Sequence, residues 1–130
     1  MSTSYAVVIE KYAERHYISK FQKKYKNAWE ITWCAVIEEF KRLDTLFETT
    51  IAETICDSEK IKICKTEFRV AQTKESRKSS GNRCIIAVEK DTNTVYVLLV
   101  YNKTDMRGSQ ETVAWKVIIR ENYAQYRNLL

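Results

Sequence analysis

The chain has 130 residues and a formal net charge of +5, with 45% hydrophobic and 12% aromatic residues. This composition predicts one packed domain, residues 1–130, and excludes a disordered chain. No apolar run approaches the roughly 20 residues of a membrane-spanning helix, and the first residues lack the charged and apolar regions of a signal peptide. We therefore expect a cytoplasmic protein with no membrane association.

The first half of the chain has one strand pattern followed by helical patterns. Residues 5–10 are rich in β-branched side chains and predict a first strand. From Tyr12 the apolar spacing becomes helical, and Asn27 with Glu30 indicates the N-cap and capping box of a second helix. This helix carries an apolar seam typical of a face against a core, formed by Trp29, Trp33, Val36, Phe40 and Leu43. Residues 44–52 predict a third short helix or an extension of the second, and residues 57–59 a polar turn.

The second half has strand patterns at residues 61–70, 84–88 and 95–101, a turn at 90–93 and an amphipathic helix at 111–123. The apolar positions of the first of these strands change parity, which predicts a bulge or bend near Lys65. Gly81 and Gly108 are the two glycines, and each predicts a turn. The pattern predicts an α+β fold, in which an N-terminal strand and helices precede an antiparallel sheet of about four strands and a C-terminal helix. We expect the helices on one face of the sheet and the other face open.

The four cysteines form no C-x-x-C pair, so the sequence offers little support for a zinc or redox motif. We expect buried free thiols, no metal and no cofactor.

The positive charge is concentrated in residues 60–83, which hold eight bases and two acids and are called the basic segment below. Within it, alternation along a strand places Lys65 and Arg69 on one face, with Glu67 between them. A loop at residues 73–82 adds Lys74, Arg77 and Lys78, and Arg83 opens the next strand. Lys103 follows Tyr101 at the end of a neighbouring strand. Convergent lysines and arginines suit phosphate groups, so this pattern predicts a polyanionic partner.

Three stretches between residues 65 and 105 resemble one known family. They read K-T-E-F-R-V-A, S-S-G-N-R-C-I-I-A-V-E-K and V-Y-V-L-L-V-Y-N-K-T-D. Their basic strand, glycine turn before Arg83, and apolar strand ending in Tyr101-Asn102-Lys103 are similar to the RelE/ParE toxin superfamily, and more to its RelE/HigB branch.

The resemblance implies a single RelE-like toxin domain of a toxin–antitoxin pair. Its partners would be mRNA, the ribosomal A site and a cognate antitoxin. Its activity would be ribosome-dependent cleavage of mRNA by metal-free attack of a ribose 2′-hydroxyl on the adjacent phosphate, which needs a base, an acid and cations. Arg83 would contact the scissile phosphate, and Lys103, Arg69 and Lys65 would stabilise its charge. Tyr101 would stack on a base or help proton transfer, and Lys74, Arg77 and Lys78 would follow the RNA backbone.

The sequence departs from many relatives in having no histidine near its C-terminal end. Its one histidine, His16, lies in the first helical stretch, where we expect a surface residue. Proton transfer would then fall to Glu67, Tyr101 or a lysine. Two alternatives remain open: a ParE-like toxin that binds DNA gyrase, and a non-catalytic RNA- or ribosome-binding domain on the same fold.

Overall fold

A computed structural model describes residues 3–106 and 110–130 of the chain. Five strands form one mixed sheet in the order β1-β5-β4-β3-β2. The strands are β1 (Ala6–Ile9), β2 (Ala52–Asp57), β3 (Ile61–Phe68), β4 (Asn82–Glu89) and β5 (Thr94–Asn102). Strands β2 to β5 pair antiparallel, as predicted, whereas β1 pairs parallel to β5. The predicted α+β class is therefore confirmed, with a parallel edge strand that the sequence did not indicate.

The helices lie before, between and after the strands. The N-terminal group is α1 (Lys11–Ala13), η1 (Glu14–Ile18), α2 (Ser19–Tyr25), α3 (Asn27–Lys41) and α4 (Leu43–Leu46). A short helix α5 (Arg77–Ser80) precedes β4, and η2 (Lys103–Asp105), α6 (Glu111–Asn122) and η3 (Ala124–Leu129) follow β5. Gly108 and the turn predicted there lie outside the described residues.

The turn between α2 and α3 differs from the prediction. Lys26, with a φ of 52°, occupies the N-cap of α3, and no side chain caps this helix. Asn27 is already helical, because the left-handed Lys26 redirects the chain one residue earlier. The predicted capping box of Asn27 and Glu30 is therefore wrong.

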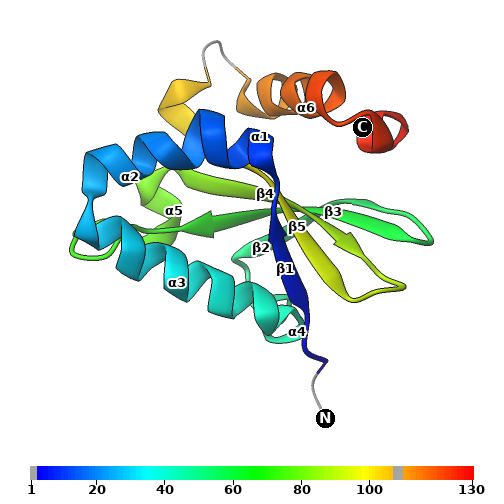
Figure 1. Cartoon of the computed structure of the whole chain (residues 1–130), viewed down its shortest axis with the longest axis horizontal. Coiled ribbons are helices and arrows are strands. Elements are labelled where there is room, and N and C mark those ends of the chain that lie inside the picture. The colour runs from blue at the N-terminus through cyan, green and yellow to red at the C-terminus, as the bar shows by residue number, and fades with distance from the viewer. Residues whose placement is uncertain (1–2, 107–109) are drawn as a thin grey trace.

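Helices cover both faces of the sheet (Figure 1). On one face, α2 and α3 pack Phe21, Trp29, Val36 and Phe40 against strand residues such as Phe68. On the other face, α6 packs Trp115 and Ile119 against strand residues that include Ile63, Ile85, Leu99 and Tyr101. The expectation of one open face is therefore wrong.

The coverage of both faces explains the pattern of β3. Ile63 belongs to the core under α6, whereas Cys64 and Phe68 belong to the core under α3. Strand β3 pairs with β4 in continuous register from Ile61 to Phe68, so the bulge predicted near Lys65 is absent from this pairing. The register shifts lie instead between Thr54 and Cys56 of β2 and opposite Ile85 and Ile86 of β4.

Strand β2 was not predicted: the predicted helix ends at residue 52, the predicted turn begins at residue 57, and no element was predicted for residues 53–56. It is an edge strand whose register shift at Ile55 interrupts the alternation of buried and exposed residues. The four cysteines are free. Cys64 and Cys84 are buried as expected, but Cys34 is exposed and Cys56 is partly exposed.

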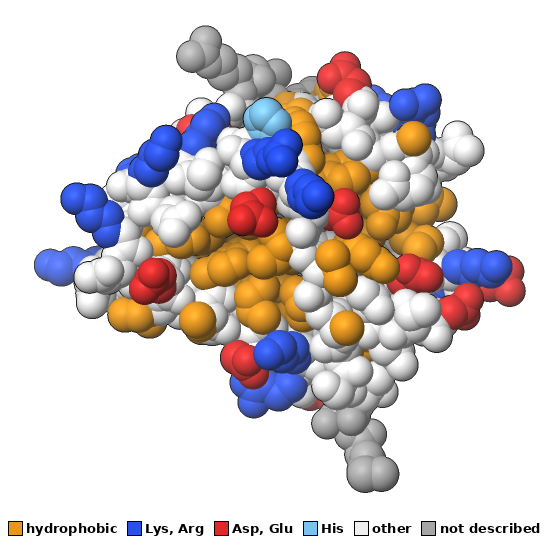
Figure 2. Space-filling view, in the orientation of Figure 1, with side chains coloured by type: hydrophobic (Ala, Val, Ile, Leu, Met, Phe, Trp, Pro, Cys, Tyr) orange, Lys and Arg blue, Asp and Glu red, His pale blue; other side chains and the backbone are white. Residues whose placement is uncertain are grey.

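A band of apolar side chains is exposed between α2 and α3 (Figure 2). A groove of about 450 Å³ lies there, lined by apolar residues that include Ile9, Ile18, Trp29 and Trp33. Trp29 is buried and stacks on Trp33, with ring centroids 5.2 Å apart, which supports the core assignment of the tryptophan seam. Among the residues that the structure describes, no helix combines the length and hydropathy needed to cross a membrane.

Candidate functional site

The α6 side of the sheet carries a row of polar residues beyond the apolar core. Glu67 of β3 lies opposite Arg83 of β4, and Arg83 lies opposite Tyr101 of β5. Because side chains two residues apart share a face, Lys65 lies on the same side of β3 as Glu67. We call Lys65, Glu67, Arg83, Tyr101 and Glu111 of α6 the sheet-end cluster.

Arg83 is held tightly within this cluster. Its Nη1 lies 3.5 Å from Oε2 of Glu67, and its guanidinium donates hydrogen bonds to the carbonyl oxygens of Asn82 at 3.0 Å and Lys78 at 3.2 Å. Only 7% of Arg83 is exposed. Oε2 of Glu67 is buried and accepts no hydrogen bond from any described residue. Arg83 thus presents a cation beside a carboxylate oxygen that has an unused lone pair.

Lys65 joins two carboxylates that sequence reasoning missed. Its Nζ lies 3.7 Å from Glu53 of β2 and 4.0 Å from Glu111 at the start of α6. The hydroxyl of Tyr101 donates to Oε2 of Glu111 at 2.6 Å. Burial, and then the bond to Glu111, raises the pKa of Tyr101 well above its ordinary value. In the sequence, Glu111 stands out only as an acidic residue in the first turn of the helix predicted at residues 111–123.

Tyr101 is fully buried. Its ring therefore has no free face on which a base could stack, so the predicted stacking role does not fit this arrangement. Its raised pKa also makes the phenol a poor proton donor near neutral pH. Tyr101 instead connects the end of β5 to α6.

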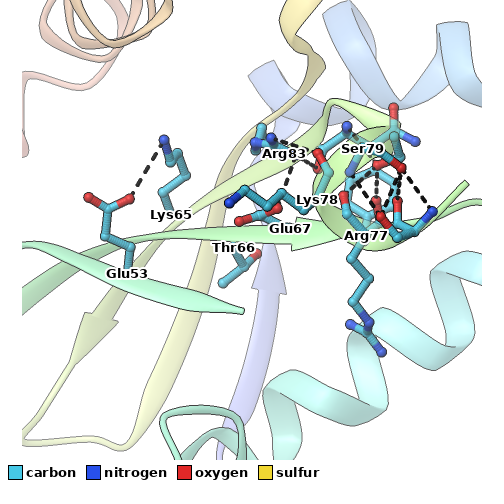
Figure 3. Close-up of polar contacts among 12 residues, drawn as sticks. Glu53, Lys65, Thr66, Glu67, Arg77, Lys78, Ser79 and Arg83 are labelled. Atoms are coloured by element: carbon cyan, nitrogen blue, oxygen red, sulfur yellow. Dashed lines mark hydrogen bonds and ion pairs between the residues drawn. The ribbon is translucent and has the colours of Figure 1, made fainter. Parts of the chain in front are cut away.

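The structure divides the basic segment between the two faces of the sheet, and Figure 3 shows Arg77 extending away from Lys65 and Arg83. Arg77 pairs with Glu39 of α3 at 3.1 Å. Arg69 lies just after the end of β3 and lines a groove beside α3 together with Arg77. The predicted common face of Lys65 and Arg69 is therefore not formed, because β3 ends at Phe68.

The predicted loop 73–82 contains the short helix α5. Ser76 and Ser79 form a capping box at its start, and Gly81 ends it with a φ of 76°. The left-handed turn predicted at Gly81 is confirmed. Lys74 and Lys78 are exposed at this end of the sheet.

Lys103 is exposed in η2. It lines a cleft on the α2 side of the sheet, whereas Arg83 faces the α6 side. His16 is exposed, as expected, and its ring packs on Tyr12 at 4.8 Å between centroids.

Comparison with known proteins gives one structural likeness. No family model matches the sequence, and no curated protein matches it. A chain in the crystal structure of the archaeal RelE–RelB complex from Pyrococcus horikoshii superposes with a TM-score of 0.55. The two are 11% identical, and the alignment covers 77% of this chain and 96% of that chain. The order of strands and helices and this superposition together establish that the chain has a RelE-like fold.

Proposed function

We propose that this protein is the toxin of a toxin–antitoxin pair and that it cleaves mRNA on the ribosome. The RelE-like fold supports the toxin assignment, and the similar structure is a RelE–RelB complex, which supports an antitoxin partner. The observation that carries the proposal is the sheet-end cluster, in which Lys65, Glu67 and Arg83 share one face.

The proposed reaction requires no cofactor. A ribose 2′-oxygen attacks the adjacent phosphorus, forming a P–O2′ bond and breaking the P–O5′ bond. The carboxylate of Glu67, whose side chain is 23% exposed, takes the proton of the 2′-hydroxyl, and Lys65 gives a proton to the departing 5′-oxygen. Arg83 stabilises the negative charge on the phosphoryl oxygens. The products are a 2′,3′-cyclic phosphate and a 5′-hydroxyl end.

The exposed bases near this face would hold the RNA. Lys74 and Lys78 are free to meet phosphates, whereas Arg77 would have to exchange its bond with Glu39. An RNA phosphate reaching Lys65 would compete with the carboxylates of Glu53 and Glu111. Lys103 and Arg69 were predicted to stabilise the charge of the scissile phosphate. They would reach it only if the chain around them moved.

One observation favours a second candidate, a non-catalytic RNA- or ribosome-binding domain. The guanidinium of Arg83 already donates to two backbone carbonyls and is almost completely buried. Such bonds serve the stability of the fold as well as catalysis. Exposed lysines alone would then give salt-dependent binding without cleavage.

Brief expression followed by primer-extension mapping of cellular mRNA separates these candidates. Lys65→Met tests the cluster, and Lys62→Met is a matched control, because Lys62 lies on the same strand but over the ring of Phe47 at 3.9 Å. Codon-phased cuts that persist in Lys62→Met and disappear in Lys65→Met support the nuclease. Growth arrest with intact mRNA and damaged DNA supports a ParE-like gyrase inhibitor instead. Intact mRNA and DNA without growth arrest support the non-catalytic domain.

A further inference from the structure

A polar cleft lies at the end of the sheet, lined by residues of α2, α5 and η2. Figure 1 shows α2 and α5 at this end of the sheet. Its volume is about 360 Å³, at the lower end of the range for small-molecule sites. An adjoining hollow of about 180 Å³ shares five of its lining residues, Lys24, Tyr25, Asn82, Asn102 and Asp105. The cleft opens on the α2 side, so it is distinct from the sheet-end cluster under α6.

The floor of the cleft contains an amide group with an unused donor. Asn102 is fully engaged: its Nδ2 donates to Oδ1 of Asn82 at 2.8 Å and to the carbonyl of Ser80 at 3.0 Å, and its Oδ1 accepts from Thr104. Asn82 is only 4% exposed, yet its Nδ2 donates to no group among residues 3–106 and 110–130. This nitrogen is not among the side-chain atoms that are both fully buried and unpaired, so it reaches the cleft, where an acceptor atom of water or of a ligand can bind it.

The rim of the cleft carries cations, carboxylates and an aromatic ring. Lys24 and Lys103 form no ion pair with any described residue, and the ammonium of Lys24 lies 5.2 Å from the centre of the Tyr25 ring. Glu75 and Asp105 supply carboxylates to the same cleft. A suitable ligand therefore needs a negative group for the lysines, a carbonyl for Asn82, hydroxyls that donate to the carboxylates, and a planar ring.

We propose that this cleft binds a nucleoside monophosphate unit. The phosphate meets Lys24 and Lys103, a base carbonyl accepts from Nδ2 of Asn82, and the ribose hydroxyls donate to Glu75 or Asp105. An acidic peptide of Asp and Glu would satisfy the lysines but would supply neither hydroxyls for the two carboxylates nor a planar ring for Tyr25. The unit has two sources with the same chemistry, a free nucleotide and a residue of single-stranded RNA.

The proposal does not depend on the proposed nuclease activity, because binding at this cleft requires neither Lys65 nor Glu67. It is tested by calorimetric titration of the full chain with each of the four nucleoside monophosphates and with single-stranded RNA tetramers. Saturation by a mononucleotide identifies a free nucleotide as the ligand, and saturation by the tetramers alone identifies an RNA residue. Either result supports the site if substitutions at Asn82, or at Lys24 and Lys20, weaken the binding.

Asn82→Asp keeps the acceptor that Asn102 uses and replaces the free donor with an acceptor. We expect it to weaken binding about tenfold or more. If this variant does not fold, the pair Lys24→Ala and Lys20→Ala replaces it, with Lys23→Ala and Lys26→Ala as a control of equal charge on the same helix region. Loss of binding in the first pair alone supports the proposal. Equal binding in both pairs, or no binding by the wild-type chain, overturns it.

Discussion

The bond between Tyr101 and Glu111 gives a direct measure of how firmly α6 is fixed on the sheet. Tyr101→Phe removes the hydroxyl that donates to the Glu111 carboxylate at 2.6 Å and leaves the ring in place. A hydrogen bond to a charged acceptor contributes about 1.5–3 kcal/mol. The side chain of Glu111 is 24% exposed, so water recovers part of the lost bond. We therefore expect the free energy of unfolding to fall by about 1.5–2 kcal/mol, the lower part of that range.

Urea denaturation of the full chain measures this change, and Tyr25→Phe is the matched control. The hydroxyl of Tyr25 donates no side-chain hydrogen bond to any described residue, and its ring packs on Phe21. We expect Tyr25→Phe to stay within about 0.5 kcal/mol of the wild type. Amide exchange in α6 should also quicken in Tyr101→Phe. Equal stability of the two variants would refute the reasoning.

Three further predictions concern the turn at Gly81, the anchoring of the basic segment and the response to alkali. Gly81→Ala should cost about 1–2 kcal/mol in urea unfolding, because φ is 76° and a Cβ there would lie 3.0 Å from Cγ of Lys103; unchanged stability would contradict this. Thr32→Val should cost about 1–3 kcal/mol and quicken exchange of the amide of Ala71, which donates to the Thr32 hydroxyl at 2.7 Å; an unaltered exchange rate would contradict this. Burial raises the pKa of Cys64 and of Tyr126 to about 12, from ordinary values of 9.0 and 10.0. Because the folded state holds these protons longer, stability should be full below about pH 9 and decline from there through about pH 12; urea midpoints that stay constant across this range would contradict it.

The sequence predicted correctly those strands and helices whose apolar residues form one continuous run or one helical face. The seam of α3 and the strands β4 and β5 are examples, because their apolar residues all serve a core. Strand β3 also has core residues on both faces, such as Ile63 and Cys64, but polar residues interrupt its apolar run, unlike that of β4. Its change of parity is the signature of a sheet covered on both sides and resembles the signature of a bulge. Strand β2 was missed because an edge strand with a register shift has neither a long apolar run nor strict alternation.

The candidate site was predictable only where residues share a strand. The alternation along β3 correctly joined Lys65 to Glu67, and the pairing with β4 added Arg83. Arg69 could not be assigned from the same alternation, because β3 ends at Phe68 and Ala71 bonds to Thr32 of α3 instead of to a strand. Glu111 is ten residues from its partner in the chain, and its position depends on the packing of α6 against the sheet.

Cleavage of mRNA on purified ribosomes by the purified chain tests the central proposal most directly. The variant is Glu67→Gln, which keeps the shape of the side chain but cannot take a proton, and the control is Glu121→Gln on the exposed part of α6. The proposed mechanism predicts cuts that leave a 2′,3′-cyclic phosphate, at a rate about 10²-fold or more lower in Glu67→Gln and unchanged in Glu121→Gln. Cleavage by Glu67→Gln at the wild-type rate, or no cleavage by the wild-type chain, would contradict it.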